Sequence, residues 1–304
     1  MLGDTVASIM VTYNPDSDVV ENAKSIVQSC AKLIIIDNGS NPDSKVYLQE
    51  LEKEQKTTII WNKENVGLGR ALNQGIQFIL NAEELRHVKW IATFDQDSTV
   101  QADYFEKMLQ SYESFSEKEA VAILAPSWIE QKLETDGALP GKQNLELQEQ
   151  RTVITSGSLM KKVAFQKIGF FEEDYFIDFL DHELCLRARS HGYKIFIVPQ
   201  VTMLHNLGNT QEHALLGSRV KATNHNYIRR YYITRNRLYT YKKYFRTEQE
   251  WIKEDFIATA KEFIIILLFE QNRLKKLGSM TRGVWDALRG KKVRFRMKAA
   301  LNLS

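Results

Sequence analysis

The sequence predicts an α/β protein with a mostly parallel central sheet and helices on both faces, followed by a helical, basic C-terminal extension. In the first hundred residues, short continuous apolar runs alternate with segments whose apolar residues recur every three or four positions. Continuous runs are typical of parallel strands that are buried on both faces. Polar residues follow where these runs end, and ligands of parallel sheets bind at the carboxyl ends of the strands.

Four apolar runs are the expected strands of this first part. They are VASIMVTY (6–13), KLIIID (32–37), TTIIWN (57–62) and VKWIATFD (88–95). The segments between them have helical spacing and are the expected helices: DSDVVENAKSIVQSC (16–30), PDSKVYLQELEKEQ (42–55) and GLGRALNQGIQFILNAE (67–83). Strands that alternate with helices in this way predict parallel pairing through crossover connections.

Beyond residue 120 the pattern is less regular. Strand-like runs cover 120–129, 151–162 and 193–205, LETDGALPGKQN (133–144) is typical of a mobile loop, and DHELCLRARSHG (181–192) predicts a helix that ends at a glycine. We therefore expect one α/β domain over 1–215, with an N-terminal half up to about residue 100 and a second half over 101–215. A helical basic region is expected over 216–304.

Charge is distributed unevenly along the 304 residues. The net charge is +3, yet residues 221–304 hold 20 Lys and Arg against 7 Asp and Glu. Such asymmetry indicates that the tail contacts an anionic surface, either a membrane or a nucleic acid. The apolar run FIIILLF (263–269) is too short to span a bilayer. Cys30 and Cys185 lack metal-site spacing, and no leader peptide precedes the first strand, so we expect reduced thiols in the cytoplasm.

Two carboxylates, Asp95 and Asp97, follow the fourth apolar run with one residue between them. Residues i and i+2 of a strand point to the same face, so the pair predicts a site for a divalent cation with oxygen ligands. The alternative is that Asp97 or Ser98 caps a following helix. A calcium-binding loop is excluded, because Val100 stands where that loop requires glycine.

Three further segments carry candidate site residues. NKENVGLGRALNQG lacks the third glycine of the dinucleotide fingerprint, but its glycines permit close approach of a ligand, with Arg70 as a phosphate partner. FFEEDYFIDFLDHELCLRA sets carboxylates among aromatic residues, which fits either a general base or a solvated helix start. His205 ends an apolar run and is either a structural histidine or a third metal ligand.

These segments together resemble the family 2 glycosyltransferases, which are inverting nucleotide-sugar enzymes of the GT-A fold. The resemblance covers about the first 215 residues and rests on VTYNP, IIIDNGS, NVGLGRALNQG, FDQDS, SGSLM, FIDFLDHELCLRA and HNLG, in this order. The last two segments look most like the rhamnosyltransferase branch, whose donor is dTDP-L-rhamnose.

The resemblance implies a role for each matching residue. Thr12, Tyr13 and Asp37 would hold the nucleotide base, and Asn65, Gly67, Arg70 and Asn73 would shape the ribose and diphosphate pocket. Asp95 would lie near the ribose and the metal, while Asp97 would bind Mg²⁺ or Mn²⁺ directly with His205 as a further ligand. Asp181 would be the catalytic base. The sequence departs from the family here, because Leu180 replaces a Glu and Glu183 follows as a rival base.

The implied activity is the inverting transfer of L-rhamnose from a nucleotide-sugar donor to a cell-surface polysaccharide or a lipid-linked glycan. One alternative is another donor, such as a UDP-hexose. Another is a non-catalytic nucleotide- or polyanion-binding module whose basic tail holds nucleic acid. We expect no nucleic-acid partner, and we expect peripheral association with the inner face of the cell membrane. The alternative for 263–269 is that it packs on the first domain or on a second copy of the chain in a homodimer.

Overall fold

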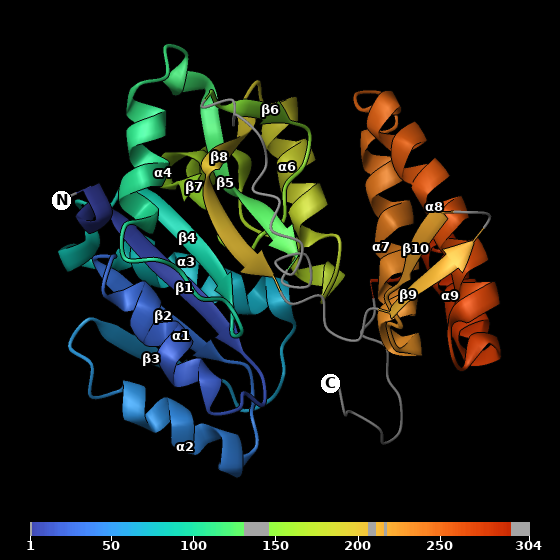
Figure 1. The fold of residues 1–304 in the computed structure, drawn as a ribbon, viewed down its shortest axis with the longest axis horizontal. Helices are drawn as coiled ribbons and strands as arrows, with labels where there is room; N and C mark the ends of the chain where they lie inside the picture. The colour runs from blue at the N-terminus through green and yellow to red at the C-terminus, as the bar shows by residue number, and fades with distance from the viewer. Residues whose placement is uncertain (1, 131–145, 206–210, 216–217, 293–304) are drawn as a thin grey trace. The chain divides into compact units, whose positions relative to one another are not determined.

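The computed structural model describes residues 2–130, 146–205, 211–215 and 218–292 (Figure 1). The loop expected at 133–144 lies outside these residues. The chain divides into two compact units, one of residues 1–173 with 180–206 and one of residues 174–179 with 207–304. The boundary expected at residue 215 thus falls after residue 206. Six residues from the expected first domain also belong to the helical unit, because their contacts are with its helices.

An eight-stranded sheet forms the centre of the first unit, in the order β3-β2-β1-β4-β7-β5-β8-β6 (Figure 1). Strands β3, β2, β1 and β4 pair in parallel, as predicted, whereas β7 is antiparallel to both β4 and β5. The strands are β1 Val6–Thr12, β2 Lys32–Asp37, β3 Thr57–Trp61, β4 Trp90–Asp95, β5 Val121–Glu130, β6 Gln148–Gln150, β7 Leu159–Lys161 and β8 Lys194–His205.

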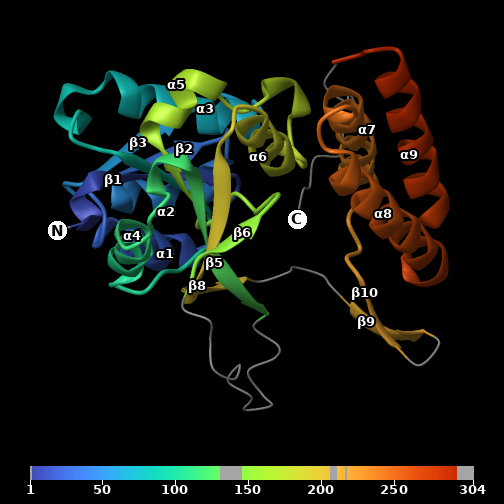
Figure 2. The same cartoon turned by 90° about the horizontal axis from the view of Figure 1, so that it is seen from above.

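Helices cover both faces of this sheet, with α1 and α4 on one face and α3, α5 and α6 on the other (Figure 2). Neighbouring side chains of β1 show the alternation that two buried faces require. Met10 belongs to the core under α1 and α4, and Ile9 lies so close to Gly75 of α3 that a Cβ there would be 2.8 Å from its Cγ2. The helices are α1 Asp18–Val27, α2 Pro42–Leu51, α3 Leu68–Asn81, α4 Tyr104–Glu113, α5 Lys162–Ile168 and α6 Leu180–Ser190.

The prediction of a strand over the whole of 151–162 is wrong. Only β7 at its end is a strand, and α5 begins directly after it. Gly157 has a positive φ of 77° and its N–H donates to the carbonyl of Thr93 at 2.7 Å, which turns the chain before β7. The apolar residues of this segment are buried as a turn and a short strand, and apolar periodicity does not distinguish that from one long strand.

The second unit contains three helices and a small hairpin. The helices are α7 Tyr227–Tyr244, α8 Gln249–Phe269 and α9 Arg273–Leu288, and β9 Gln211–Leu215 pairs antiparallel with β10 Ser218–Ala222. The helical region expected from residue 216 therefore begins later, after this hairpin. Helix α9 packs closely on α7, because a Cβ on Gly283 would lie 2.8 Å from the carbonyl oxygen of Tyr231. No helix in the part of the chain that the structure describes is long and apolar enough to cross a bilayer.

Candidate functional site

The register of the parallel strands brings their carboxyl ends level with one another. Thr12 at the end of β1 lies opposite Asp37 of β2, and Asp37 lies opposite Trp61 of β3. On its other side, Val11 of β1 lies opposite Asp95, the last residue of β4. The loops that leave these strands therefore start at a common edge of the sheet, where the candidate site residues were expected.

Asn38 joins two of these loops. Its Oδ1 accepts a hydrogen bond from the N–H of Val66 at 2.9 Å, and its Nδ2 donates to Oδ1 of Asn65 at 3.1 Å. Asn65 Oδ1 also accepts from the N–H of Gly67 at 2.9 Å, at the start of α3. Asn65 and Gly67 are thus held at the sheet edge by Asn38, a strand-end polar residue of the IIIDNGS segment to which the resemblance assigned no role.

Gly39 allows the loop after β2 to lie directly on the loop after β3. Its φ is 83°, and a Cβ there would lie 2.5 Å from the carbonyl carbon of Glu64 and 2.7 Å from the nitrogen of Asn65. Only glycine combines a positive φ with such close backbone contact. The IIIDNGS segment therefore meets the NVGLGR segment because of this glycine.

The three residues expected at the nucleotide base differ in their exposure. Asp37 is fully buried and its carboxylate accepts from the N–H of Ser40 at 3.2 Å. Thr12 is also buried, and its hydroxyl has no hydrogen-bond partner among the described residues. Tyr13 is half-buried, and its N–H donates to Oε1 of Gln96 at 2.8 Å. Tyr13 is thus the member of the three whose side chain reaches the surface of the edge.

Asp95 and Asp97 lie in a turn that follows β4, and do not both belong to the strand. Strand β4 ends at Asp95, and the N–H of Ser98 donates to the carbonyl of Asp95 at 3.2 Å. The expectation that strand alternation sets the two carboxylates side by side is therefore wrong. The capping alternative is also wrong, because α4 begins at Tyr104, well beyond Asp97 and Ser98.

Two residues hold this turn in place. Ser156 Oγ accepts from the N–H of Asp95 at 3.0 Å and lies 2.8 Å from Ser98 Oγ, so the SGS and FDQDS segments are joined. Gln96 lies between the two aspartates and ties the turn to Tyr13 and, through its carbonyl, to Nδ2 of Asn22 at 3.0 Å. Neither was predicted as a site residue, since each acts through a partner more than fifty positions away.

The chemistry of the two aspartates suits a hard divalent cation. Asp95 is half-buried and Asp97 is exposed, both at the sheet edge. Mg²⁺ is commonly held by one or two carboxylates, with phosphate oxygens of the substrate completing its coordination. Within the described residues there is no group of three or more His, Cys, Asp or Glu that could hold a metal. The side chain of His205, the expected further ligand, lies outside the described residues.

Arg70 and Asn73, both expected at the diphosphate, lie on α3 in different surroundings. Arg70 is exposed, with its Nε 4.0 Å from a carboxylate oxygen of Glu173. Asn73 is buried, and its side chain accepts from the N–H of Phe171 at 2.9 Å and donates to the carbonyl of Phe171 and to Glu173. Arg70 is therefore available to an anionic ligand, whereas Asn73 anchors the segment that leads toward Asp181.

Asp181 and its rival Glu183 lie in the first turn of α6 but in opposite environments. Asp181 is half-buried, and its Oδ1 accepts from the N–H of His182 at 2.8 Å. Glu183 has an exposed fraction of 0% and pairs with Nη2 of Arg187 at 2.8 Å. Arg187 in turn donates to two backbone carbonyls, so Glu183 belongs to a buried structural pair. Burial also raises the pKa of the neighbouring Cys185 thiol to about 12, which keeps it neutral.

The model of the family described as glycosyl transferase family 2 matches residues 8–169 of the chain, and that range contains every edge segment described above except α6 and His205. The chain belongs to this family. It is a glycosyltransferase, and the family resemblance seen in the sequence is confirmed.

This glycosyltransferase is similar along nearly its whole length to the dTDP-rhamnosyl transferase RfbF of Shigella flexneri. The two are 25% identical over 313 residues, which cover 95% of this chain and 97% of RfbF. A shorter similarity links it to a putative glycosyltransferase, EpsH, of Bacillus subtilis, with 27% identity over 35% of this chain and 30% of EpsH.

Solved glycosyltransferases share the fold. The structure of S. aureus TarS 1–349 in complex with UDP-GlcNAc matches with a TM-score of 0.58 and 11% identity, over 93% of this chain and 81% of that one. GalNAc-T7 with UDP, GalNAc and Mn²⁺ matches with a TM-score of 0.58 and 13% identity, over 81% of this chain and 49% of that one. The glycosyltransferase therefore has the GT-A fold that the sequence predicted, with a further unit of C-terminal helices.

Proposed function

We propose that this glycosyltransferase moves L-rhamnose from dTDP-L-rhamnose onto a hydroxyl group of a polysaccharide or a lipid-linked glycan, with inversion at the anomeric carbon. The observation that carries the proposal is the similarity to dTDP-rhamnosyl transferase RfbF, which extends over nearly the full length of both chains. A similarity of that extent includes α6 and the C-terminal helices, where acceptor-side residues and the membrane-facing surface are expected.

Asp181 is the proposed catalytic base. It takes the proton of the acceptor hydroxyl while that oxygen attacks the anomeric carbon and the bond from this carbon to the donor diphosphate breaks. One displacement inverts the configuration, so a β-linked donor gives an α-linked product. Glu183 is not proposed, because a carboxylate that is fully buried and paired with Arg187 is out of reach of an acceptor.

Arg70 is proposed to neutralise charge that develops on the leaving nucleotide diphosphate. Its guanidinium is exposed on α3, next to Gly67 and Asn65 at the sheet edge, and its pairing with Glu173 is long, at 4.0 Å. Asp97 and Asp95 would hold Mg²⁺ or Mn²⁺, which when bound supplies further positive charge at the diphosphate. Ser156 and Gln96 hold the backbone of the turn that carries the two aspartates, so this turn is formed before the donor arrives.

Donor choice tests this function. With dTDP-L-rhamnose, UDP-glucose and UDP-galactose supplied separately with Mg²⁺ or Mn²⁺, we expect dTDP-L-rhamnose to give at least about tenfold higher turnover. Release of nucleotide diphosphate measures the rate, and NMR of the product measures the anomeric configuration. Preference for a UDP-hexose would refute the donor assignment within the same family. Absence of turnover with every donor would favour the nucleotide-binding module instead.

The helical unit carries an apolar face that we propose docks on an anionic membrane surface, where a lipid-linked acceptor would be found. Phe256, Ile264 and Leu268 of α8 have exposed fractions of 64%, 49% and 50%. These positions recur at helical spacing, so they share one side of α8. Exposed basic residues lie on α8 (Lys253, Lys261), on α9 (Lys275, Arg282) and directly after α9 (Arg289). Helix α8 also carries four acidic residues: Glu250, Glu254, Asp255 and Glu262.

Apolar side chains flanked by Lys and Arg are the composition of helices that lie in a membrane interface. Each basic residue near an anionic surface contributes roughly 1 kcal/mol of attraction. An open groove of about 530 Å³ adjoins this face and is lined in part by Phe245, Ile252 and Phe256. The apolar area of α8 and the positive charge of α7 and α9, which together hold ten Lys and Arg against one Asp, therefore favour a lipid surface over a second copy of the same basic chain.

Vesicle flotation checks the docking proposal. The protein should float with vesicles that contain anionic lipid, much less with neutral vesicles, and less at high salt. Ile264→Ser with Leu268→Ser should lower vesicle affinity about tenfold, because both side chains lose apolar area. Val46→Ser with Val163→Ser is the matched control, since these apolar residues of the first unit are exposed at least as much as the α8 pair. Protein that stays unbound at low salt, or that forms a dimer abolished by the α8 pair, would overturn it.

A further inference from the structure

The segment Asp174–Phe179, which enters α6 directly before Asp181, has an unusual backbone. Phe176, Asp178 and Phe179 all have positive φ, at 63°, 63° and 66°. Non-glycine residues adopt this region only where surrounding structure imposes it, and such strain concentrates at functional sites. The segment groups with the C-terminal helices, not with the sheet unit on either side of it in sequence.

Asn236 of α7 holds most of this segment through one side-chain amide. Its Nδ2 lies 2.9 Å from the carbonyl oxygen of Tyr175, 2.8 Å from that of Ile177 and 3.0 Å from that of Asp178. An amide nitrogen has two hydrogens, so at least one of the three contacts is shared. Asn236 is fully buried, so these carbonyls depend on its amide in the place of water.

Arg235 fixes the orientation of that amide. Its Nε and Nη2 donate to Oδ1 of Asn236 at 3.0 and 2.9 Å, which leaves Nδ2 to face the segment. Nη2 of Arg235 also donates to the carbonyl of Asp174 at 2.7 Å. Arg235 has an exposed fraction of 0% and lies over the ring of Tyr232 at 4.9 Å. Both neighbours on α7 therefore bind the backbone of the same six residues.

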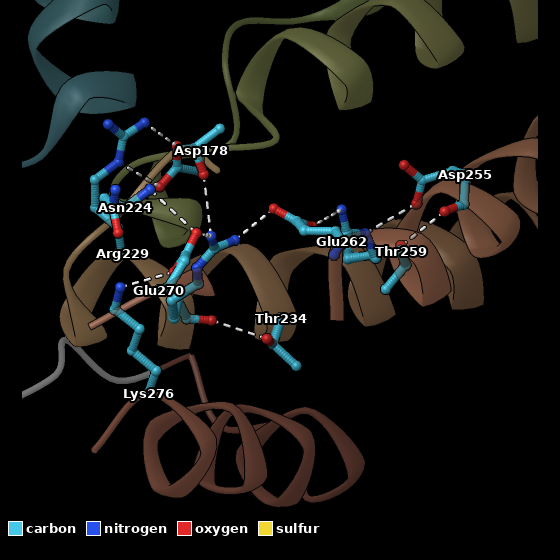
Figure 3. Close-up of polar contacts among 12 residues, drawn as sticks. Asp178, Asn224, Arg229, Thr234, Asp255, Thr259, Glu262, Glu270 and Lys276 are labelled. Atoms are coloured by element: carbon cyan, nitrogen blue, oxygen red, sulfur yellow. Dashed lines mark hydrogen bonds and ion pairs between the residues drawn. The ribbon is translucent and has the colours of Figure 1, made fainter. Parts of the chain in front are cut away.

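Two side-chain contacts complete this arrangement, which we call the α7 clamp and define as Arg229, Arg235, Asn236 and Thr240. Nη2 of Arg229 donates to Oδ1 of Asp178 at 2.7 Å, a pair visible in Figure 3. The hydroxyls of Thr240 and Tyr175 are 2.9 Å apart. The clamp therefore reaches the segment at both ends, from Asp174 to Asp178.

Helix α7 is itself held in place by buried ion pairs with its neighbours in the helical unit. Figure 3 shows Glu270 at the centre of a polar network, in which it accepts from Arg230 at 2.6 Å and from Lys276 at 2.7 Å. Arg230 also pairs with Glu262 of α8. Both Arg230 and Glu270 are buried, and charges in such surroundings require these partners. The clamp residues thus project from a helix with little freedom to shift.

We propose that Asn236 is a positioning residue that sets the backbone leading to Asp181, and this inference rests on the proposed role of Asp181 as base. Only Leu180 separates the clamped segment from Asp181. The strained conformation at Phe176, Asp178 and Phe179 persists because the clamp binds the carbonyls around it. Removing the amide releases the segment, and a carboxylate displaced by about 1 Å loses on the order of 10²-fold in rate.

The test is a kinetic comparison of Asn236→Ala with the native enzyme. We expect kcat for transfer to fall about 10- to 100-fold while KM for the donor stays within about twofold, because the donor-side loops do not depend on the clamp. In the Asp181→Asn background, the same substitution should lower transfer by less than about threefold further. If Asn236 only stabilised the fold, its substitution would not lower kcat selectively, and its effect would not be smaller in the Asp181→Asn background.

Tyr241→Phe is the matched control on α7, since it removes one half-buried hydrogen bond, to Asp255 of α8 at 2.5 Å, away from the clamp residues. Arg229→Gln removes the ion pair with Asp178 and leaves the buried clamp residues Arg235 and Asn236 unchanged. It should lower kcat about three- to tenfold. If Asn236→Ala does not fold, Arg229→Gln decides. Unchanged kcat in a folded clamp variant, or an equal loss in Tyr241→Phe, would overturn the inference. Full transfer by Asp181→Asn would instead refute the proposed base.

Discussion

Asp181→Asn is expected to lower the rate of sugar transfer by about 10²-fold or more while donor affinity is retained. Asparagine keeps the size of the side chain and its contact with the N–H of His182, but it cannot accept the proton of the acceptor hydroxyl. Single-turnover kinetics with a saturating acceptor measures the loss, and binding of the nucleotide diphosphate, measured by calorimetry, checks that the donor site is intact.

Glu183→Gln separates the two candidate bases. Glu183 is buried against Arg187, so the substitution leaves a buried guanidinium without its counter-charge. We expect the free energy of unfolding to fall by up to about 3 kcal/mol while kcat of the folded protein is retained. Loss of transfer in Glu183→Gln together with full transfer in Asp181→Asn would exchange the two roles.

The distinction between these residues illustrates what the sequence could not supply. Periodicity located α6 and its glycine stop, but two residues two positions apart lie about 200° apart around a helix, and only the packing shows which of them faces the core. One signal was present in the sequence, because Glu183 and Arg187 have the i, i+4 spacing of a helical ion pair. Asp181 has no basic residue at that spacing.

The first four strands and their helices could be predicted because each gives a local pattern in which apolar residues recur at the spacing of a strand or a helix. The residues that hold the site in place were not found, because their partners are distant in sequence. Ser156 acts on Asp95, and Asn236 acts on carbonyls 58 to 61 positions earlier. Every residue type has the same backbone carbonyl. A side chain that binds carbonyls therefore has no partner side chain whose residue type could be recognised in the sequence.

The hairpin of β9 and β10 and the six-residue segment within the helical unit show the same limit for domain division. The composition of residues 174–179 is similar to that of the expected second half of the first domain, over 101–215. From the sequence alone, aromatic residues that pack on α7 cannot be distinguished from aromatic residues that pack on a sheet. Phe176 stacks on Tyr232 at 5.1 Å between ring centroids. The positive φ values of the segment distinguish it in the structure. They could not be predicted from the sequence, because the segment contains no glycine that would indicate them.

Asp97→Asn is expected to abolish metal-dependent transfer, with a loss of about 10²-fold or more, while the fold survives. Asp97 is exposed in the turn after β4, so its side chain contributes little to stability. In the native enzyme, Mn²⁺ should raise the thermal midpoint measured with a nucleotide diphosphate, because binding to the native state stabilises it by mass action. In Asp97→Asn this Mn²⁺-dependent increase should be absent.

Asp103→Asn is the matched control, because Asp103 is also an exposed aspartate near the start of α4 and pairs only at the surface, with Lys107 at 2.7 Å. Both substitutions remove one negative charge from the same stretch of chain, so a general electrostatic effect would lower donor binding equally in the two variants. A cation site predicts a loss in Asp97→Asn alone. Full transfer by Asp97→Asn, or by the native enzyme in excess chelator, would leave neutralisation of the leaving diphosphate to Arg70 and the backbone N–H groups at the start of α3.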